Sequence, residues 1–413
     1  MNNDKKNFFW NMLGSIVNSF TSLFFMIIVT RINGTNIAGI FTFAFSLACL
    51  FQVIANYSGR TFQVTNIDNN INDSDFIYNR ITSCIFMVIF VILYLLLKDY
   101  NYYKISIIFL FVLYRLLESF TDSMYGVIQK NNELYKVGIS LFLKGILGTV
   151  VFFILDFIFK NVILSIVGLL IVNFLIFYFY DYKNFKVFYN HKKYNKKINI
   201  KLFKIGVFVF GFTFLTQYIL NAPKYAIDDY LSNEMQTIYG IISMPATFMV
   251  LCSQFIIQPL LVKISDFIKN NNYNDLLKLS LKTILYITLI GLLAIIGAYF
   301  LGIQLLELVY GINLNNYLVS LLVIIIGATL FSISYAISSI LTAMRKTFIQ
   351  IIFYIICSLI ILFLSRYLVF NYNILGGTLS YLISMFILCN MYLIYYLIIV
   401  NKNIKKVVEK WRK

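Results

Sequence analysis

The sequence predicts an all-α, polytopic membrane protein, and three observations support that fold class. Hydrophobic residues make up 60% of the 413 residues, whereas charged residues make up only 12%. Soluble domains carry about 25% charged residues, so this chain has too little charge to cover a surface that faces water. The apolar residues are gathered in long runs between short polar segments, and no run alternates with the period of two that is typical of a membrane barrel.

The apolar runs give twelve predicted transmembrane helices, because about 20 apolar residues are needed to cross a hydrocarbon core about 30 Å thick. They are 9–30, 36–57, 80–97, 104–125, 134–155, 162–180, 205–227, 236–262, 279–301, 317–341, 348–369 and 375–400. Six of them precede the longest connection and six follow it. We therefore expect an N-terminal six-helix lobe at 1–180, a basic cytoplasmic linker at 181–204, and a C-terminal six-helix lobe with a basic tail at 205–413.

Lys and Arg are distributed unevenly over the connections, and this predicts the orientation of the chain. If the N-terminus is cytoplasmic, the connections on that side hold 26 of the 34 Lys and Arg residues and the outer connections hold 6. Positive residues favour the cytoplasmic side, so we expect both termini there, in a multi-pass protein of the cell membrane. The net charge of +17 is then a topology signal, and we expect no nucleic-acid partner.

The sequence lacks the patterns that enzymes and ATP-driven pumps require. It has no GxxxxGK[ST] phosphate loop, no HExxH and no cluster of metal ligands. Its five cysteines lie within or at the edge of apolar runs without CxxC spacing, as small hydrophobic residues do. Every predicted outer connection is short, which leaves no room for a catalytic domain. We expect a protein that is not an enzyme and uses no cofactor or metal.

Charged residues inside the predicted spans mark the first candidate site, because ionisable groups at bilayer depth usually face a cavity or a partner. The fourth span carries Arg115, Glu118 and Asp122 at spacings of three and four, which place them on one helical face. The fifth span carries Lys144. Two interpretations stay open. The charges form either a salt-bridge cluster that only locks two helices together, or a cavity lined by the two cations, whose position and titration the carboxylates set.

Polar residues also follow one face of other spans. Asn18 belongs to a Ser/Asn row in the first span, and a row in the second span leads to Arg60 at its cytoplasmic end. The row in the seventh span includes Gln217, Asn221, Lys224 and Asp228. Such rows either join helices by hydrogen bonds or line an aqueous path, and several of them beside buried charge favour a shared cavity.

A cavity that is surrounded by cations and contains few acids should bind an anion. The candidate cations are Arg31, Arg60, Arg115, Lys144 and Lys224, and the candidate amides beside them are Asn18, Gln217 and Asn221. A diphosphate is one candidate ligand, because arginine matches phosphate oxygens in bidentate geometry.

Two prolines are candidate hinges. Pro223 lies inside the seventh span, where it has no N–H to donate and clashes with the carbonyl of Ile219, so the helix should kink there. Pro245 lies inside the eighth span. The prolines either make static kinks that packing requires, or form a hinge pair that bends during transport.

Five stretches of the sequence resemble a known family. They are WNMLGSIVNS at 10–19, TRINGTNIAGIFTFAFS at 30–46, YSGRTFQVTN at 57–66, YRLLESFTDSMYGVIQKNNELYKVGIS at 114–140, and YILNAPKYAIDDYLSNEMQTIYGIISMPATFMV at 218–250. Together with the twelve spans, they are similar to the polysaccharide (O-antigen and capsule type) flippases of the multidrug/oligosaccharidyl-lipid/polysaccharide exporter superfamily. The last four spans resemble this family only in spacing and hydropathy.

The resemblance implies two six-helix bundles around a central cavity and alternating access to the two sides of the membrane. It implies that the cargo is an oligosaccharide repeat on undecaprenyl diphosphate, moved to the outer leaflet for surface polysaccharide biosynthesis. Ion-gradient coupling is also implied, with Glu118, Asp122 and Asp228 as the carboxylates to test. Expected partners are this lipid-linked oligosaccharide, membrane lipids, and the polysaccharide polymerase and glycosyltransferases of the same pathway.

Other functions stay open. A multidrug or cation antiporter of the same superfamily should have an acidic excess where this chain has a basic one. A flippase for a peptidoglycan lipid precursor is a second alternative. A membrane-embedded glycan polymerase or ligase should carry a large outer loop, and a scaffold that transports nothing should lack a cavity of sufficient size.

Overall fold

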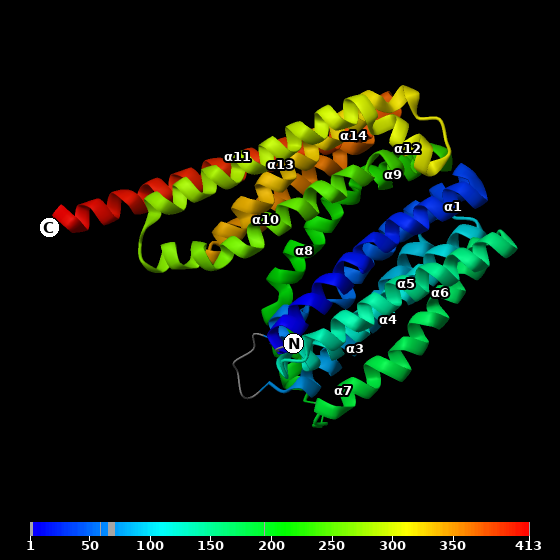
Figure 1. The fold of residues 1–413 in the computed structure, drawn as a ribbon, viewed down its shortest axis with the longest axis horizontal. Coiled ribbons are helices and arrows are strands. Elements are labelled where there is room, and N and C mark those ends of the chain that lie inside the picture. The colour runs from blue at the N-terminus through cyan, green and yellow to red at the C-terminus, as the bar shows by residue number, and fades with distance from the viewer. Residues whose placement is uncertain (1–2, 58, 65–70, 194, 413) are drawn as a thin grey trace. The chain divides into compact units, whose positions relative to one another are not determined.

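The computed structural model describes residues 3–57, 59–64, 71–193 and 195–412, and most of these residues are helical (Figure 1). No β-strand occurs within the described ranges. Contacts between helices divide the chain into two compact units, Met1–Gln217 and Tyr218–Lys413. We call them the N-terminal unit and the C-terminal unit.

The N-terminal unit is built from helices that follow one another with short connections. They are α1 (Asn3–Ala55), α2 (Gly59–Val64), α3 (Asp73–Leu96), α4 (Tyr102–Lys130), α5 (Leu134–Phe159), α6 (Val162–Ile176), α7 (Tyr182–Phe188) and the first part of α8 (Lys196–Tyr230). A π-helical turn, Phe177–Asp181, joins α6 to α7 without a break.

The C-terminal unit contains the end of α8 and six further helices among its described residues. They are α9 (Asn233–Ile242), α10 (Met244–Lys269), α11 (Tyr273–Gly297), α12 (Ile303–Tyr310), α13 (Leu318–Ala343) and α14 (Thr347–Arg412). A π-helical segment, Ala298–Gly302, joins α11 to α12, and a 3-10 turn, Asn315–Tyr317, precedes α13.

These helices account for the twelve predicted spans. Nine helical stretches of the described chain are long and apolar enough to cross a membrane. Two of them contain a backbone break and hold two predicted spans each: α1 breaks at Gly34 (φ 82°, ψ 175°) and α14 breaks at Asn373 (φ 51°, ψ −133°). The remaining span is α4, which has 29 residues and carries charged side chains along its length. The prediction of a polytopic, all-α membrane protein is confirmed.

A close approach of α1 and α5 organises the N-terminal unit. A Cβ atom added to Gly138 would overlap the backbone carbonyl of Trp10, and one added to Gly14 would overlap the carbonyl of Gly138. Two backbones approach this closely only where the crossing residues are very small. Beyond its break, α1 packs on α4 instead, where the ring centroid of Phe41 lies 4.9 Å from that of Phe111.

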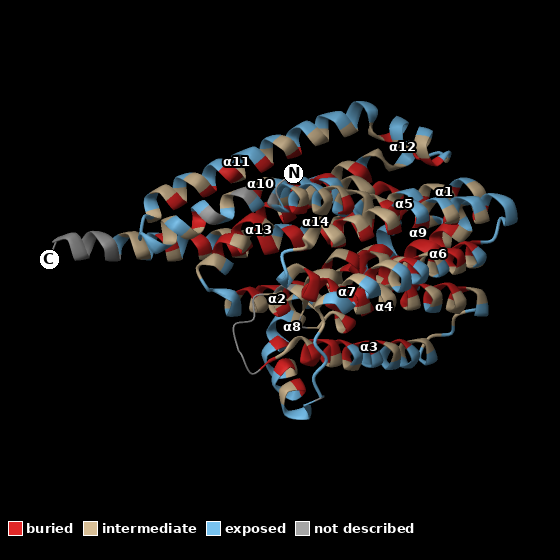
Figure 2. Ribbon diagram, turned by 60° about the horizontal axis from the view of Figure 1, so that its bottom comes forward, coloured by how far each residue is buried: buried red, intermediate tan, exposed pale blue. Residues whose placement is uncertain are grey.

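The outer faces of the helices are apolar. On α3 the exposed side chains include Ile85, Phe86, Ile89, Phe90 and Leu93, and Figure 2 shows pale blue, exposed residues along α3 and α11. In water such a surface would drive aggregation, whereas in a bilayer it is solvated by lipid tails. Polar side chains are therefore informative where they turn inward.

The segment predicted as a basic linker, 181–204, is mostly helical. It contains α7 and the first turns of α8, and only a short stretch between them is irregular. The Lys192 N–H donates to Ser74 Oγ at 2.8 Å, and the Asn79 side chain donates to Asn199 Oδ1 at 2.7 Å. These contacts fasten the segment to the start of α3, which begins seven residues before the predicted third span.

Candidate functional site

The first candidate site lies between α1 and α4 and is centred on Arg115. Arg115 Nη1 donates to Glu118 Oε2 at 2.6 Å, and Nη2 donates to Cys49 Sγ at 3.2 Å. Gln52 Nε2 reaches the same Glu118 oxygen at 3.4 Å, and the guanidinium lies 4.6 Å from the ring centre of Phe45. The spacing of three along α4 therefore forms an ion pair, as the sequence predicted for residues on one helical face.

Asp122, one turn further along α4, is shared by two arginines. Arg60 Nη1 and Arg80 Nη2 each lie 3.5 Å from one of its carboxylate oxygens. Arg80 is held in place by the carbonyl of Ala55 at 2.9 Å and by Asn56 Oδ1 at 2.6 Å. Arg80 is 5% exposed, whereas the Arg60 and Asp122 side chains are 30% and 31% exposed. Of this group, Arg60 and Asp122 can meet a ligand from outside.

We call these five residues the arginine cluster: Arg60, Arg80, Arg115, Glu118 and Asp122. Three guanidinium groups face two carboxylates, so the cluster carries one net positive charge. Arg115 Nε is buried and has no hydrogen-bond partner among the described atoms. A cluster with more donors than its own carboxylates satisfy is suited to a further anion.

Lys144 does not join this cluster. Its Nζ donates to Asp181 Oδ2 at 2.6 Å and to the Tyr125 hydroxyl at 3.0 Å, and the Lys144 and Asp181 side chains are 7% and 1% exposed. The π-helical turn after α6 ends at Asp181 and presents this carboxylate to α5. The expectation that Lys144 lines a cavity with Arg115 is corrected, because the ion pair encloses its charge; the helix-locking interpretation describes it instead.

Two further predicted residues of the N-terminal unit lie elsewhere on α1. Arg31 is exposed and lies three residues before the break at Gly34. Asn18 is half-buried on the first limb, and its backbone carbonyl accepts a hydrogen bond from Thr21. The contacts that define the arginine cluster come from the second limb of α1, so they do not include these two residues.

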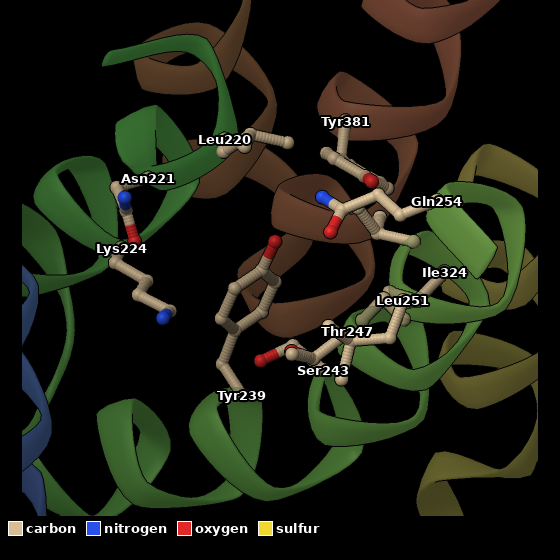
Figure 3. A pocket seen from close by; sticks show the side chains of 12 residues that line it. Leu220, Asn221, Lys224, Tyr239, Ser243, Thr247, Leu251, Gln254, Ile324 and Tyr381 are labelled. Carbon is tan, nitrogen blue, oxygen red and sulfur yellow. The ribbon is translucent and has the colours of Figure 1, made fainter. Parts of the chain in front are cut away.

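The C-terminal unit contains a second candidate site, a cavity of about 330 Å³. Its floor is formed by aliphatic side chains such as Leu220, Leu251 and Ile324 (Figure 3). The polar side chains that line it are Asn221 and Lys224 from α8, Tyr239 from α9, Ser243, Thr247 and Gln254 around and along α10, and Tyr381 from α14. We call it the Lys224 pocket.

The seventh-span row is divided by this pocket. Asn221 and Lys224 line it, whereas Gln217 and Asp228, one turn before and one turn after them, are half-buried and are not among its lining residues. The neighbouring Asp229, which the sequence did not single out, lies 3.9 Å from Arg366 of α14.

The two hinge candidates differ in their effect on the backbone. Helix α8 continues through Pro223 to Tyr230. The predicted eighth span, by contrast, is divided: α9 ends at Ile242, and α10 begins at Met244 with Pro245 in its first turn. Proline has no N–H for the carbonyl of residue 241 and is tolerated best at the start of a helix. The break follows from that preference.

Several residues of both sites were missed by sequence reasoning. Arg80 and Asp181 stand at the ends of predicted spans, where a charge is normally a boundary signal. Tyr239 and Tyr381 belong to apolar runs, and only their positions in the fold identify them. Among the described residues, no group of three or more His, Cys, Asp or Glu side chains could hold a metal ion.

Known proteins resemble this chain in sequence and in fold, although no family model matches it. It is 23% identical over 404 residues to the capsular polysaccharide biosynthesis protein CapF of Staphylococcus aureus, and the match covers 95% of this chain and 98% of CapF. The lipid II flippase MurJ in an inward closed conformation superposes with a TM-score of 0.71 at 18% identity, covering 94% of this chain and 87% of MurJ.

A third protein with the same fold is a multidrug resistance MATE family transporter of the MOP superfamily in an inward-facing conformation. It superposes with a TM-score of 0.68 at 11% identity, covering 94% of this chain and 96% of the transporter. These proteins are transporters, flippases and a biosynthesis protein, in agreement with the expectation that the chain is not an enzyme. The chain has the fold of the multidrug/oligosaccharidyl-lipid/polysaccharide exporter superfamily, and its match to CapF confirms the sequence resemblance to the polysaccharide flippases of that superfamily.

Proposed function

We propose that the protein flips an oligosaccharide repeat on undecaprenyl diphosphate from the cytoplasmic to the outer leaflet, for the biosynthesis of a capsule or similar surface polysaccharide. The observation that carries the proposal is the arginine cluster, a partly exposed group of three guanidiniums within membrane-spanning helices. The match to CapF along almost the whole chain supports the pathway. The likeness to MurJ supports the type of cargo.

The cluster supplies what a diphosphate lacks in a bilayer. A charged group in hydrocarbon loses its hydration, which costs many kcal/mol unless other charges and hydrogen bonds replace the water. Guanidinium groups match phosphate oxygens through paired N–H donors. Arg60 is open to a ligand at 30% exposure, and Arg115 lies behind it on the same face of α4 as Asp122.

Carboxylates within the cluster favour release of the cargo. Glu118 already occupies Arg115, and Asp122 already occupies Arg60 and Arg80. A phosphate must replace these partners, so it binds less tightly than it would to bare arginines. Protonation of either carboxylate would free its arginine for the phosphate, which is a route for coupling to protons, and Asp228 is the third carboxylate to test. We propose alternating access with both termini in the cytoplasm of a cell whose plasma membrane holds the protein.

Export of surface polysaccharide tests the proposal. Arg115→Ala should abolish export from a deletion strain while the amount of protein in the membrane stays the same. The matched control is Lys130→Ala, which removes a cation from the end of the same helix, where it pairs with Asp73, and should export normally. Arg115→Lys should restore part of the activity, because it keeps the charge and loses the paired donors. Full export by Arg115→Ala would overturn the proposal.

A peptidoglycan lipid precursor is the second candidate cargo, and the fold similarity to the lipid II flippase MurJ favours it. The two cargos share a diphosphate, so the cluster serves both. Rescue of cells depleted of their own lipid II flippase discriminates them. A dedicated sugar-repeat flippase should fail to rescue growth, whereas a lipid II flippase should restore it.

A further inference from the structure

We propose that the Lys224 pocket binds one sugar residue of the cargo, and that this sugar carries a carboxylate. The proposal rests on the proposed function and adds a second, separate site to it. It assigns the diphosphate to the arginine cluster of the N-terminal unit and an acidic sugar to the C-terminal unit.

The size of the pocket fits a small headgroup. Its volume is about 330 Å³, near the lower end of the ~300–1,000 Å³ that is typical of small-molecule sites. This is space for one sugar ring with its immediate substituents, and it is too small for a whole repeat. The pocket therefore selects a part of the cargo.

The walls combine apolar faces with hydrogen-bonding groups, as the two faces and the rim of a sugar ring require. Tyr239 and Tyr381 are 2% and 5% exposed, so they form fixed walls against which the C–H face of a sugar can pack. Asn221, Ser243 and Gln254 supply amide and hydroxyl groups for the sugar hydroxyls. Figure 3 shows these side chains converging from α8, α9, α10 and α14 on one space.

The charge of the pocket selects a single carboxylate. Lys224 is the one charged residue among the described side chains that line it, and in Figure 3 it extends from α8 toward Tyr239. A lysine provides one compact charge, whereas a diphosphate is better matched by several guanidiniums. A carboxylate on the sugar balances this charge in a site of low dielectric, where a neutral sugar leaves it without a ligand of opposite sign.

The spacing in the sequence explains how one helix supplies both recognition groups. Asn221 and Lys224 are three residues apart on α8, so they lie on one face with their side chains about one turn apart. Pro223 between them points to another face. The amide at 221 can therefore contact a hydroxyl while the ammonium at 224 contacts the carboxylate of the same ring.

Thermal stability of the purified full chain in lipid nanodiscs tests the pocket with three probes at equal ionic strength: glucuronate, glucose and inorganic pyrophosphate. Glucuronate should raise the unfolding temperature more than glucose does. The difference should disappear in Lys224→Met, persist in Lys224→Arg, and persist in the control Lys282→Met, which removes an exposed lysine of α11. Equal shifts for the two sugars, or no effect of Lys224→Met, would overturn the proposal. A larger Lys224-dependent shift with pyrophosphate would make the pocket a phosphate site instead, and would also overturn it.

Export in two host strains separates this inference from the proposed function. One strain makes an acidic repeat and the other makes a neutral repeat. Lys224→Met should reduce export of the acidic repeat about tenfold, equivalent to about 1.4 kcal/mol, and leave export of the neutral repeat unchanged. Arg115→Ala should abolish both. Equal loss of the two repeats in Lys224→Met would reject the acidic-sugar site and leave the flippase proposal standing. Normal export by Arg115→Ala would reject the flippase proposal itself.

Discussion

Two groups of ionised side chains in the N-terminal unit share the same chemistry in different surroundings. Lys144 and Asp181 meet at 2.6 Å and are almost fully enclosed. Arg60 and Asp122 lie 3.5 Å apart, and about a third of each side chain is exposed. A charge inside a membrane-spanning helix is therefore not by itself a binding site. The exposure of its partners decides whether it locks helices together or can exchange partners with a ligand.

The largest effect on stability is expected at the enclosed pair. Lys144→Met leaves the Asp181 carboxylate buried without a counter-charge, which should lower the free energy of unfolding by about 3–5 kcal/mol. The double variant Lys144→Met/Asp181→Leu should recover most of this loss and should still export polysaccharide. Denaturant unfolding in detergent provides the measurement.

The exposed Lys282→Met serves as the control for this pair and should unfold like the wild-type protein. If Lys144→Met also unfolds like the wild-type protein, the pair is not a lock, and the comparison between the two groups fails. Lys144 would then return to the residues that bind cargo.

An intermediate effect is expected at Arg80, which belongs to the arginine cluster but is 5% exposed. Arg80→Ala removes the donor from the carbonyl of Ala55 and from Asn56 Oδ1. Loss of hydrogen bonds from a charged group should cost about 1.5–3 kcal/mol, visible as a lower thermal midpoint. A cost larger than that of Lys144→Met would show that enclosure does not rank these residues.

The smallest effect on stability is expected at Asp122, because ion pairs that are this exposed contribute about 0–1 kcal/mol. Asp122→Asn should unfold close to the wild-type protein and yet export less polysaccharide, since the amide can neither balance Arg60 nor accept a proton. Export measured at two external pH values tests the coupling role. Wild-type export at both values would remove Asp122 from the candidate carboxylates.

Contacts within one helix could be predicted from the sequence, and contacts between helices could not. The spacing of three between Arg115 and Glu118 is enough to predict their ion pair. The partner of Lys144 is 37 residues away, at the end of a π-helical turn that no residue pattern announces. Arg80 was assigned to a boundary because the irregular segment before α3 is shorter than expected.

The spans were predictable for a similar reason, since their length and apolar composition are local properties. The break at Gly34 has a sequence signal, because glycine alone adopts its backbone angles without strain. The break at Asn373 has a weaker one, and the different effects of Pro223 and Pro245 depend on packing. The Lys224 pocket was predicted only through its α8 residues, because its aromatic walls come from apolar runs of other helices.

The break at Gly34 makes the two limbs of α1 rotationally independent. Each residue added to a helix turns everything beyond it by about 100°. One alanine inserted after Ala38 would rotate Cys49 and Gln52 off the side of α1 that faces Arg115, whereas the same alanine inserted beside Gly34 would be absorbed by the irregular corner. The corner thus acts as a phase buffer: changes of length in the first limb need not alter the register of the second limb against α4.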